Sequence, residues 1–81
     1  MHIVADHQIN DPEKFWSVVQ QTSIPEGITL HSTLPNQAGN RAVCHWEADS
    51  LNTVRTLVEG VVGQYSHNEY FEVDPTKAIG L

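Results

Sequence analysis

Stretches in which apolar residues alternate with polar ones are separated along the chain by stretches in which apolar residues recur every three or four positions. Alternation is typical of a half-buried β-strand, and the longer spacing is typical of an amphipathic helix. The pattern predicts these elements: strands over 2–8, 28–34, 41–48 and 66–73, a helix from 12 to about 23, and a helix between 50 and 63.

Capping residues support both helices. Asp11 can accept a hydrogen bond at an N-cap, and Pro12 suits the first helical position. Asp49 or Ser50 can cap the second helix, and Gly63 is expected to end it in a left-handed conformation. The apolar residues of the second helix recur on one face: Leu51, Val54, Leu57, Val58 and Val61.

The predicted order is β-α-β-β-α-β within a single domain covering residues 1–81. This order is typical of the ferredoxin-like α+β fold, with a four-stranded antiparallel sheet and two helices on one face. Because two helices cover only one face, the other face must be polar, bind a ligand or pack against another subunit.

Composition and charge limit the possible partners. The chain has 40% hydrophobic residues, as globular domains do, and a formal net charge of -6. This charge repels phosphate backbones and anionic membranes, so we expect neither nucleic acid nor membrane as a partner. No glycine-rich nucleotide fingerprint is present, so no nucleotide cofactor is expected.

Cys44 has no second cysteine to pair with, and its thiol is expected in the core with a raised pKa. The first residues lack the features of a secretory signal, so we expect a cytoplasmic location.

His31 and His45 lie in the two strands that the polar turn at 35–40 connects. In a regular hairpin both imidazoles would emerge on one face of the sheet, and Glu47 would point the same way and could orient an imidazole. The opposite, buried face would then contain Leu30, Ser32, Leu34, Ala42, Cys44 and Trp46. A shift of the pairing by one residue would separate the two imidazoles.

Neutral imidazoles are common ligands of zinc, nickel and copper. The predicted metal site therefore comprises His7, His31 and His45, with nickel or zinc as the expected ion. Because neighbouring residues of a strand point to opposite faces, either His7 or Asp6 could join the site. His2 lies close to the terminus, and no role is expected for it.

Tyr70 is predicted to lie on the face that the helices leave open, where its hydroxyl could bind a ligand or a neighbouring subunit. With the same alternation, His67, Glu69 and Phe71 would point toward the helices. Two buried ionisable side chains would be costly without partners, so this assignment requires a bulge, an opening to solvent or a functional polar pair.

The strand segment 42–48 and the ending 68–74, together with the length and the element order, resemble small ferredoxin-like dimeric α/β-barrel proteins of bacteria. These are proteins of uncharacterised function, similar to a group that has nickel-binding members. The resemblance covers nearly the whole chain and implies a homodimer in which two sheets face each other. It also implies either ligand binding in the cleft between the sheet and the helices or cofactor-free oxygenation. The apolar ending of segment 75–81 is expected to pack across the second subunit.

Three functions remain open at this point. The first is a homodimeric binding module in which His31, His45 and a nearby His7 or Asp6 hold a divalent transition metal or a small polar ligand. Glu47 and Tyr70 are further candidate ligand-binding residues of this module. The second is a cofactor-free oxygenase or isomerase, in which a histidine such as His31 removes a proton from a small aromatic substrate in an apolar cleft and Tyr70 or Trp46 positions that substrate. The third is a noncatalytic assembly or regulatory subunit that uses the open sheet face to dimerise.

Overall fold

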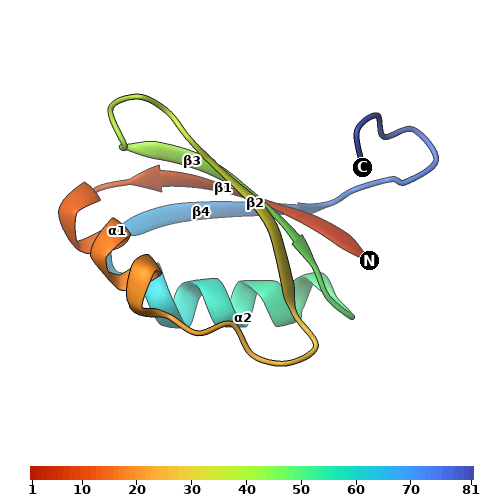
Figure 1. Ribbon diagram of the computed structural model, residues 1–81, viewed down its shortest axis with the longest axis horizontal. Helices are drawn as coiled ribbons and strands as arrows, with labels where there is room; N and C mark the ends of the chain where they lie inside the picture. The colour runs from red at the N-terminus through yellow and green to blue at the C-terminus, as the bar shows by residue number, and fades with distance from the viewer.

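The computed structural model describes residues 1–81 and contains the six predicted elements in the predicted order (Figure 1). The elements are β1 (His2–Ile9), α1 (Pro12–Gln21), β2 (Thr29–Pro35), β3 (Arg41–Glu47), α2 (Leu51–Val62) and β4 (Ser66–Glu72).

The helix caps follow the sequence with one exception. The side chain of Asp11 accepts a hydrogen bond from the Lys14 amide, and Ser50 caps the second helix in the same way. At the end of α1 the backbone of Thr22 turns to an extended conformation, so the helix is slightly shorter than predicted. Gly63 ends α2 with φ -58°, in the right-handed region, so the left-handed conformation predicted for it is wrong.

The four strands form one sheet in the order β2-β3-β1-β4, and every neighbouring pair is antiparallel. Both helices lie below the sheet in Figure 1, while the segment after β4 rises on the other side. The protein is therefore an α+β domain whose topology is compatible with the ferredoxin-like fold. Neither helix is long and apolar enough to cross a membrane.

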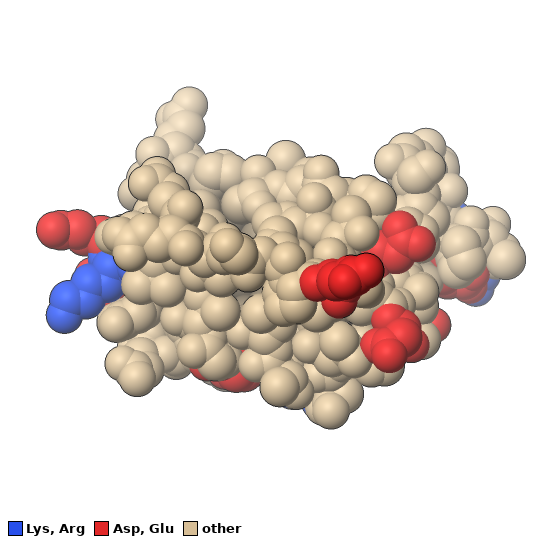
Figure 2. Space-filling model, turned by 60° about the horizontal axis from the view of Figure 1, so that its bottom comes forward, with Lys and Arg blue, Asp and Glu red and all other residues tan.

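The core lies between the sheet and the helices. Its members are Ile3, Ala5, Ile9, Phe15, Ala42, Cys44, Trp46, Ala48, Val54, Val58 and Val62. Burial raises the pKa of the Cys44 thiol, as predicted. On the outer surface of the helix layer, which Figure 2 turns toward the viewer, acidic side chains form separate groups rather than one continuous patch.

A β-bulge in β2 changes the predicted faces of this strand. Leu30 pairs with Trp46, but the next paired residue is Ser32, which lies opposite His45. Beyond the bulge Thr33 therefore faces the core, where it contacts the Cys44 thiol, and Leu34 is 64% exposed on the open face. The prediction that Ser32 and Leu34 belong to the buried face is wrong, because the extra residue reverses the alternation.

The predicted faces of β4 are also reversed. Tyr70 pairs with Ala5 on the helix side, whereas Phe71 pairs with Val4 on the open face and is 56% exposed. His67 and Glu69 lie on the same open face as Phe71 and need no buried partners. The helix side of β4 is polar but hydrogen-bonded, through Ser66, Asn68 and Tyr70. These hydrogen bonds allow polar side chains to occupy the inner face that the sequence pattern assigned to Phe71.

Candidate metal centre

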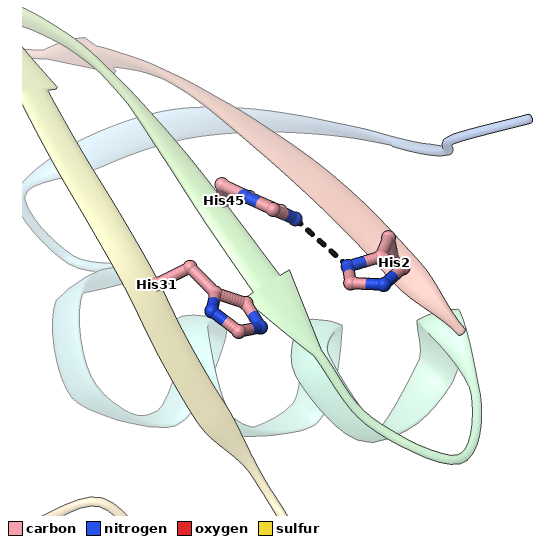
Figure 3. Close-up of side chains that lie close together, drawn as sticks. All are labelled: His2, His31 and His45. Atoms are coloured by element: carbon pink, nitrogen blue, oxygen red, sulfur yellow. Dashed lines mark hydrogen bonds between the residues drawn. The ribbon is translucent and has the colours of Figure 1, made fainter. Parts of the chain in front are cut away.

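Three histidines from three neighbouring strands meet on the open face of the sheet (Figure 3). His2 comes from β1, His31 from β2 and His45 from β3. One ring nitrogen from each lies within 4.8 Å of those of the other two. The predicted placement of His31 and His45 on one face is confirmed by their rings, which stack with centroids 4.7 Å apart.

The sheet register explains how residues so distant in sequence come together. Val4 pairs with His45, and His2 points to the same face as Val4 because the two are separated by two positions in β1. In β2 the bulge leaves both His31 and Ser32 opposite His45. The bulge thus allows His31 to stay beside His45 while the rest of β2 changes its alternation.

His2 and His45 are held together directly. Nδ1 of His2 and Nε2 of His45 lie 2.9 Å apart in a hydrogen bond, in which one ring nitrogen carries the proton and the other accepts it. The ring centroid of His2 lies 5.1 Å from that of His45 and 5.6 Å from that of His31. Each histidine of the cluster therefore contacts both of the others.

Glu47 supplies a negative charge at the edge of this cluster. Its Oε1 accepts a hydrogen bond of 2.8 Å from Nε2 of His31, so Glu47 orients one imidazole of the cluster, as the sequence suggested. Glu47 also pairs with His2 across the sheet. The hydrogen bond from His31, followed by the charge of His2, lowers the pKa of the Glu47 carboxyl.

The cluster resists the uptake of protons at its centre. Burial lowers the pKa of His45, and the neighbouring imidazoles of His31 and His2 lower it further, because protonation would place like charges side by side. His45 is therefore held in the neutral form, which is the form that binds metal ions.

The arrangement fits a divalent metal ion after small side-chain movements. Two nitrogens bound to one Zn²⁺ at about 2.05 Å in tetrahedral geometry lie about 3.3 Å apart. The 2.9 Å between His2 and His45 is slightly shorter than this value, and all three ligand nitrogens lie within 4.8 Å of one another. Because the cluster is only partly buried, rotation of the side chains can bring all three nitrogens to the required distances.

His7 does not join this cluster. It lies on the helix side of β1, 2% exposed, and its Nδ1 is 2.6 Å from the amide oxygen of Asn68. The predicted grouping of His7 with His31 and His45 is wrong because residues 3, 5 and 7 all point into the core. Asp6, the alternative, lies on the open face but pairs with Arg41 at 3.1 Å rather than with a histidine.

Tyr70 is also absent from the cluster. Its hydroxyl donates a hydrogen bond to Glu59 of α2, and burial together with this contact raises its pKa. An apolar cavity of about 70 Å³ between the sheet and the helices is lined by Trp46 and His7 but not by His31. His31 therefore does not occupy the apolar cleft in which the enzyme hypothesis placed it as a base.

Sequence reasoning missed His2. The signal that could have found it is the parity of β1: Ile3 and Ala5 are the apolar, core-facing residues, so His2 must point to the same open face as Val4. Its position near the terminus gave the opposite expectation, but β1 is paired on both sides from Ile3 onward, and His2 itself pairs with Glu47.

No protein-family model matches this chain, and no curated protein or solved structure does either. The function proposed below is therefore supported by the chain's own residues.

Proposed function

We propose that this protein is a homodimeric binding module that holds a divalent transition metal, nickel or zinc, through His2, His31 and His45. The observation that carries the proposal is the convergence of three imidazole nitrogens within 4.8 Å on one face of the sheet. Imidazole is a preferred ligand for nickel, copper and zinc, whereas calcium and magnesium prefer oxygen ligands.

Charge favours the same ion class. Glu47 contacts His31 beside the site, and the chain as a whole has a formal net charge of -6. A divalent cation bound by three neutral imidazoles keeps its full charge, so a neighbouring carboxylate stabilises it. Carboxylates that hold metal-bound histidines also fix the orientation of the ring.

The dimer is supported by the apolar side chains of the open face. Leu34 and Phe71 lie on this face and are 64% and 56% exposed, although most large apolar residues of the chain are at least partly covered. Ile79 and Leu81 of the C-terminal segment are exposed too, and this segment borders a hollow beside His45. A second copy packed on this face would cover these side chains, and exposed apolar patches commonly mark such interfaces.

The decisive experiment is a calorimetric and thermal titration of the protein, prepared without a histidine tag, with Ni²⁺ and Zn²⁺. At a free metal concentration 100 times Kd, binding to the folded state stabilises it by about 2.7 kcal/mol. For a domain of this size, that corresponds to a rise in Tm of roughly 10 to 20 °C. The NMR signals of the His2, His31 and His45 rings should shift or broaden in the same titration.

His45→Ala is expected to weaken metal binding at least tenfold, because the central ligand is lost. His67→Ala is the matched control, since His67 lies on the same face in β4 but pairs with Glu69 outside the cluster. Equal losses in the two variants would show that metal binds to surface histidines in general. If Ni²⁺, Zn²⁺ and Cu²⁺ leave both the melting curve and the histidine signals unchanged, the proposed function is wrong.

A further inference from the structure

A hollow on the open face of the sheet adjoins the histidine cluster. It has a volume of about 180 Å³, and His45, which contributes a nitrogen to the cluster, is also one of its lining residues. Five of the seven lining residues are hydrophobic, and none is Asp, Glu, Lys or Arg. The candidate cation site and an apolar space therefore share one residue.

Hydrogen bonds hold the outer wall of this hollow in place. The amide of Val73 donates to a carbonyl of β1 at 2.8 Å, which ties the start of the C-terminal segment to the sheet. Asp74 then turns the chain back, because its side chain accepts hydrogen bonds from the amide and the hydroxyl of Thr76. Its carbonyl accepts from the amide of Ala78 at 3.1 Å. The chain from Ala78 onward returns to line the hollow together with His45.

A metal ion at the cluster would keep at least one coordination position free. Zinc is four-coordinate in most protein sites, and the cluster offers three nitrogens. No fourth histidine, cysteine or carboxylate joins them. Glu47 accepts a hydrogen bond from His31, and Asp6 is paired with an arginine. The remaining position has to be filled by water or by a ligand from solution.

The charge at this free position favours a ligand with a single negative charge. Three neutral imidazoles leave a divalent ion with its full charge, and the carboxylate of Glu47 compensates only part of it. The hydrogen bond from His31 lowers the pKa of the Glu47 carboxyl, so this group is ionised at neutral pH. One positive charge therefore remains, and one carboxylate from solution would neutralise it.

We propose that the metal-loaded protein binds a small aliphatic monocarboxylate, with the carboxylate at the free coordination position and the alkyl chain in the hollow. This inference rests on the proposed function, because it requires the metal ion. Apolar walls with one or a few fixed polar groups are typical of small-molecule sites. The volume of about 180 Å³ exceeds that of an engineered cavity of roughly 150 Å³ that binds benzene, so an alkyl chain of about five carbon atoms fits.

The position of the hollow is compatible with the proposed dimer. The hollow lies between the open face of the sheet and the C-terminal segment, which rises on the side away from the helices (Figure 1). A second copy packed on this face would shield the alkyl chain further from water. The apolar cavity between the sheet and the helices lies on the opposite side and takes no part.

Three probes separate the contribution of the carboxylate from that of the chain. Hexanoate has both, acetate lacks most of the chain, and hexanol lacks the charge. NMR titrations of the Zn²⁺-loaded protein, followed on the methyl groups of Val4 and Leu81, should show saturable binding of hexanoate. Each buried methylene strengthens binding about fourfold, so burial of two methylenes makes hexanoate bind about 15-fold more tightly than acetate. Hexanol should bind more weakly than hexanoate, and removal of Zn²⁺ should abolish most of the affinity for hexanoate.

A pair of leucine variants tests the place of the alkyl chain. Leu81→Ser removes part of the apolar wall and should weaken the binding of hexanoate but not that of acetate. Leu34→Ser is the matched control, because Leu34 is exposed on the same face but does not line the hollow. The proposed dimer would cover both leucines, so the control also accounts for a change in association. Both variants should bind Zn²⁺ as the unaltered protein does.

Failure of the metal site and failure of the carboxylate site give different results. If calorimetry detects no binding of Zn²⁺, the proposed function and this inference are both wrong. If Zn²⁺ binds, three results would each overturn the inference and leave the metal site intact. These are equal affinities for hexanoate and acetate, equal affinities for hexanoate with and without Zn²⁺, and equal effects of the two leucine variants.

Discussion

Replacement of Phe71 by aspartate tests the packing of two sheets in the proposed dimer. Phe71 lies on the open face of β4 and is 56% exposed in the single chain. An aromatic side chain buries about 150 to 250 Å² when it is fully covered. Roughly 100 Å² of Phe71 is therefore still available to a partner, and at about 25 cal/mol per Å² its burial would contribute about 2.5 kcal/mol per subunit.

Both subunits contribute in a symmetric dimer, so the variant loses roughly 5 kcal/mol of apolar burial and gains two carboxylates that must be desolvated. Area converts only partly into affinity, because association also costs rotational and side-chain entropy. If the loss of binding free energy is only about 2 kcal/mol, less than half of the lost apolar burial, the Kd of the dimer rises about 30-fold.

Sedimentation equilibrium over a range of concentrations measures this change directly. The unaltered protein is expected to have twice the chain mass of 9.0 kDa, and Phe71→Asp should return it to the mass of a single chain. Ile24→Asp is the matched control, because Ile24 is 41% exposed but belongs to the cavity lining on the helix side. A monomeric unaltered protein, or a Phe71→Asp variant that associates as tightly as the unaltered chain, would refute the reasoning.

Three further results are expected. Since burial lowers the pKa of His7 below the value of about 6.5 for an unfolded histidine, the unfolded state binds the proton first on acidification. Stability should be complete above about pH 6.5 and fall below it, until the folded-state pKa is reached, by at most about 1.4 kcal/mol per pH unit for this group. Urea unfolding of the unaltered protein and His7→Gln at several pH values checks this slope, which should be smaller in the variant. Glu47→Gln should weaken Ni²⁺ binding about tenfold while leaving the melting temperature of the metal-free protein nearly unchanged, and an unchanged Kd in calorimetry would contradict the role given to its charge. Cys44 should react slowly with iodoacetamide in the folded protein and rapidly in urea, because its thiol is 6% exposed and its pKa is raised; equal rates would contradict its place in the core.

The elements whose signals are local could be predicted from the sequence. Asp11 and Ser50 cap their helices as expected, because capping depends on residues within one turn. The shared face of His31 and His45 was predicted from alternation, although the detailed register was not. The bulge in β2 depends on how the whole strand fits its neighbour and the core. His31, the residue at which the register shifts, does not by itself indicate a bulge.

Of the two errors that matter most for the candidate sites, one depends on long-range partners and the other on local strand parity. Asn68 and Tyr70 face the helices because Glu59, nine and eleven residues away respectively, accepts their hydrogen bonds, and no local pattern in β4 contains that information. His7 was assigned to the metal site by its chemistry, although Ile3 and Ala5 already indicated that its side of β1 is the buried one. Side-chain chemistry suggested the ligands, but strand parity decided which of them could meet.

The proposed metal centre also has a property that none of its histidines has alone. Burial, and then the charges of His31 and His2, lower the pKa of His45, so the cluster disfavours a proton at its centre, while Glu47 at its edge stabilises positive charge. A proton bonds to the lone pair of one ring only. A metal ion at the proposed site would be bound by the lone pairs of all three rings at once. Bringing the three rings together therefore shifts the competition between protons and metal ions toward metal. The same rings dispersed over the sheet, like the exposed His67, would lack this preference.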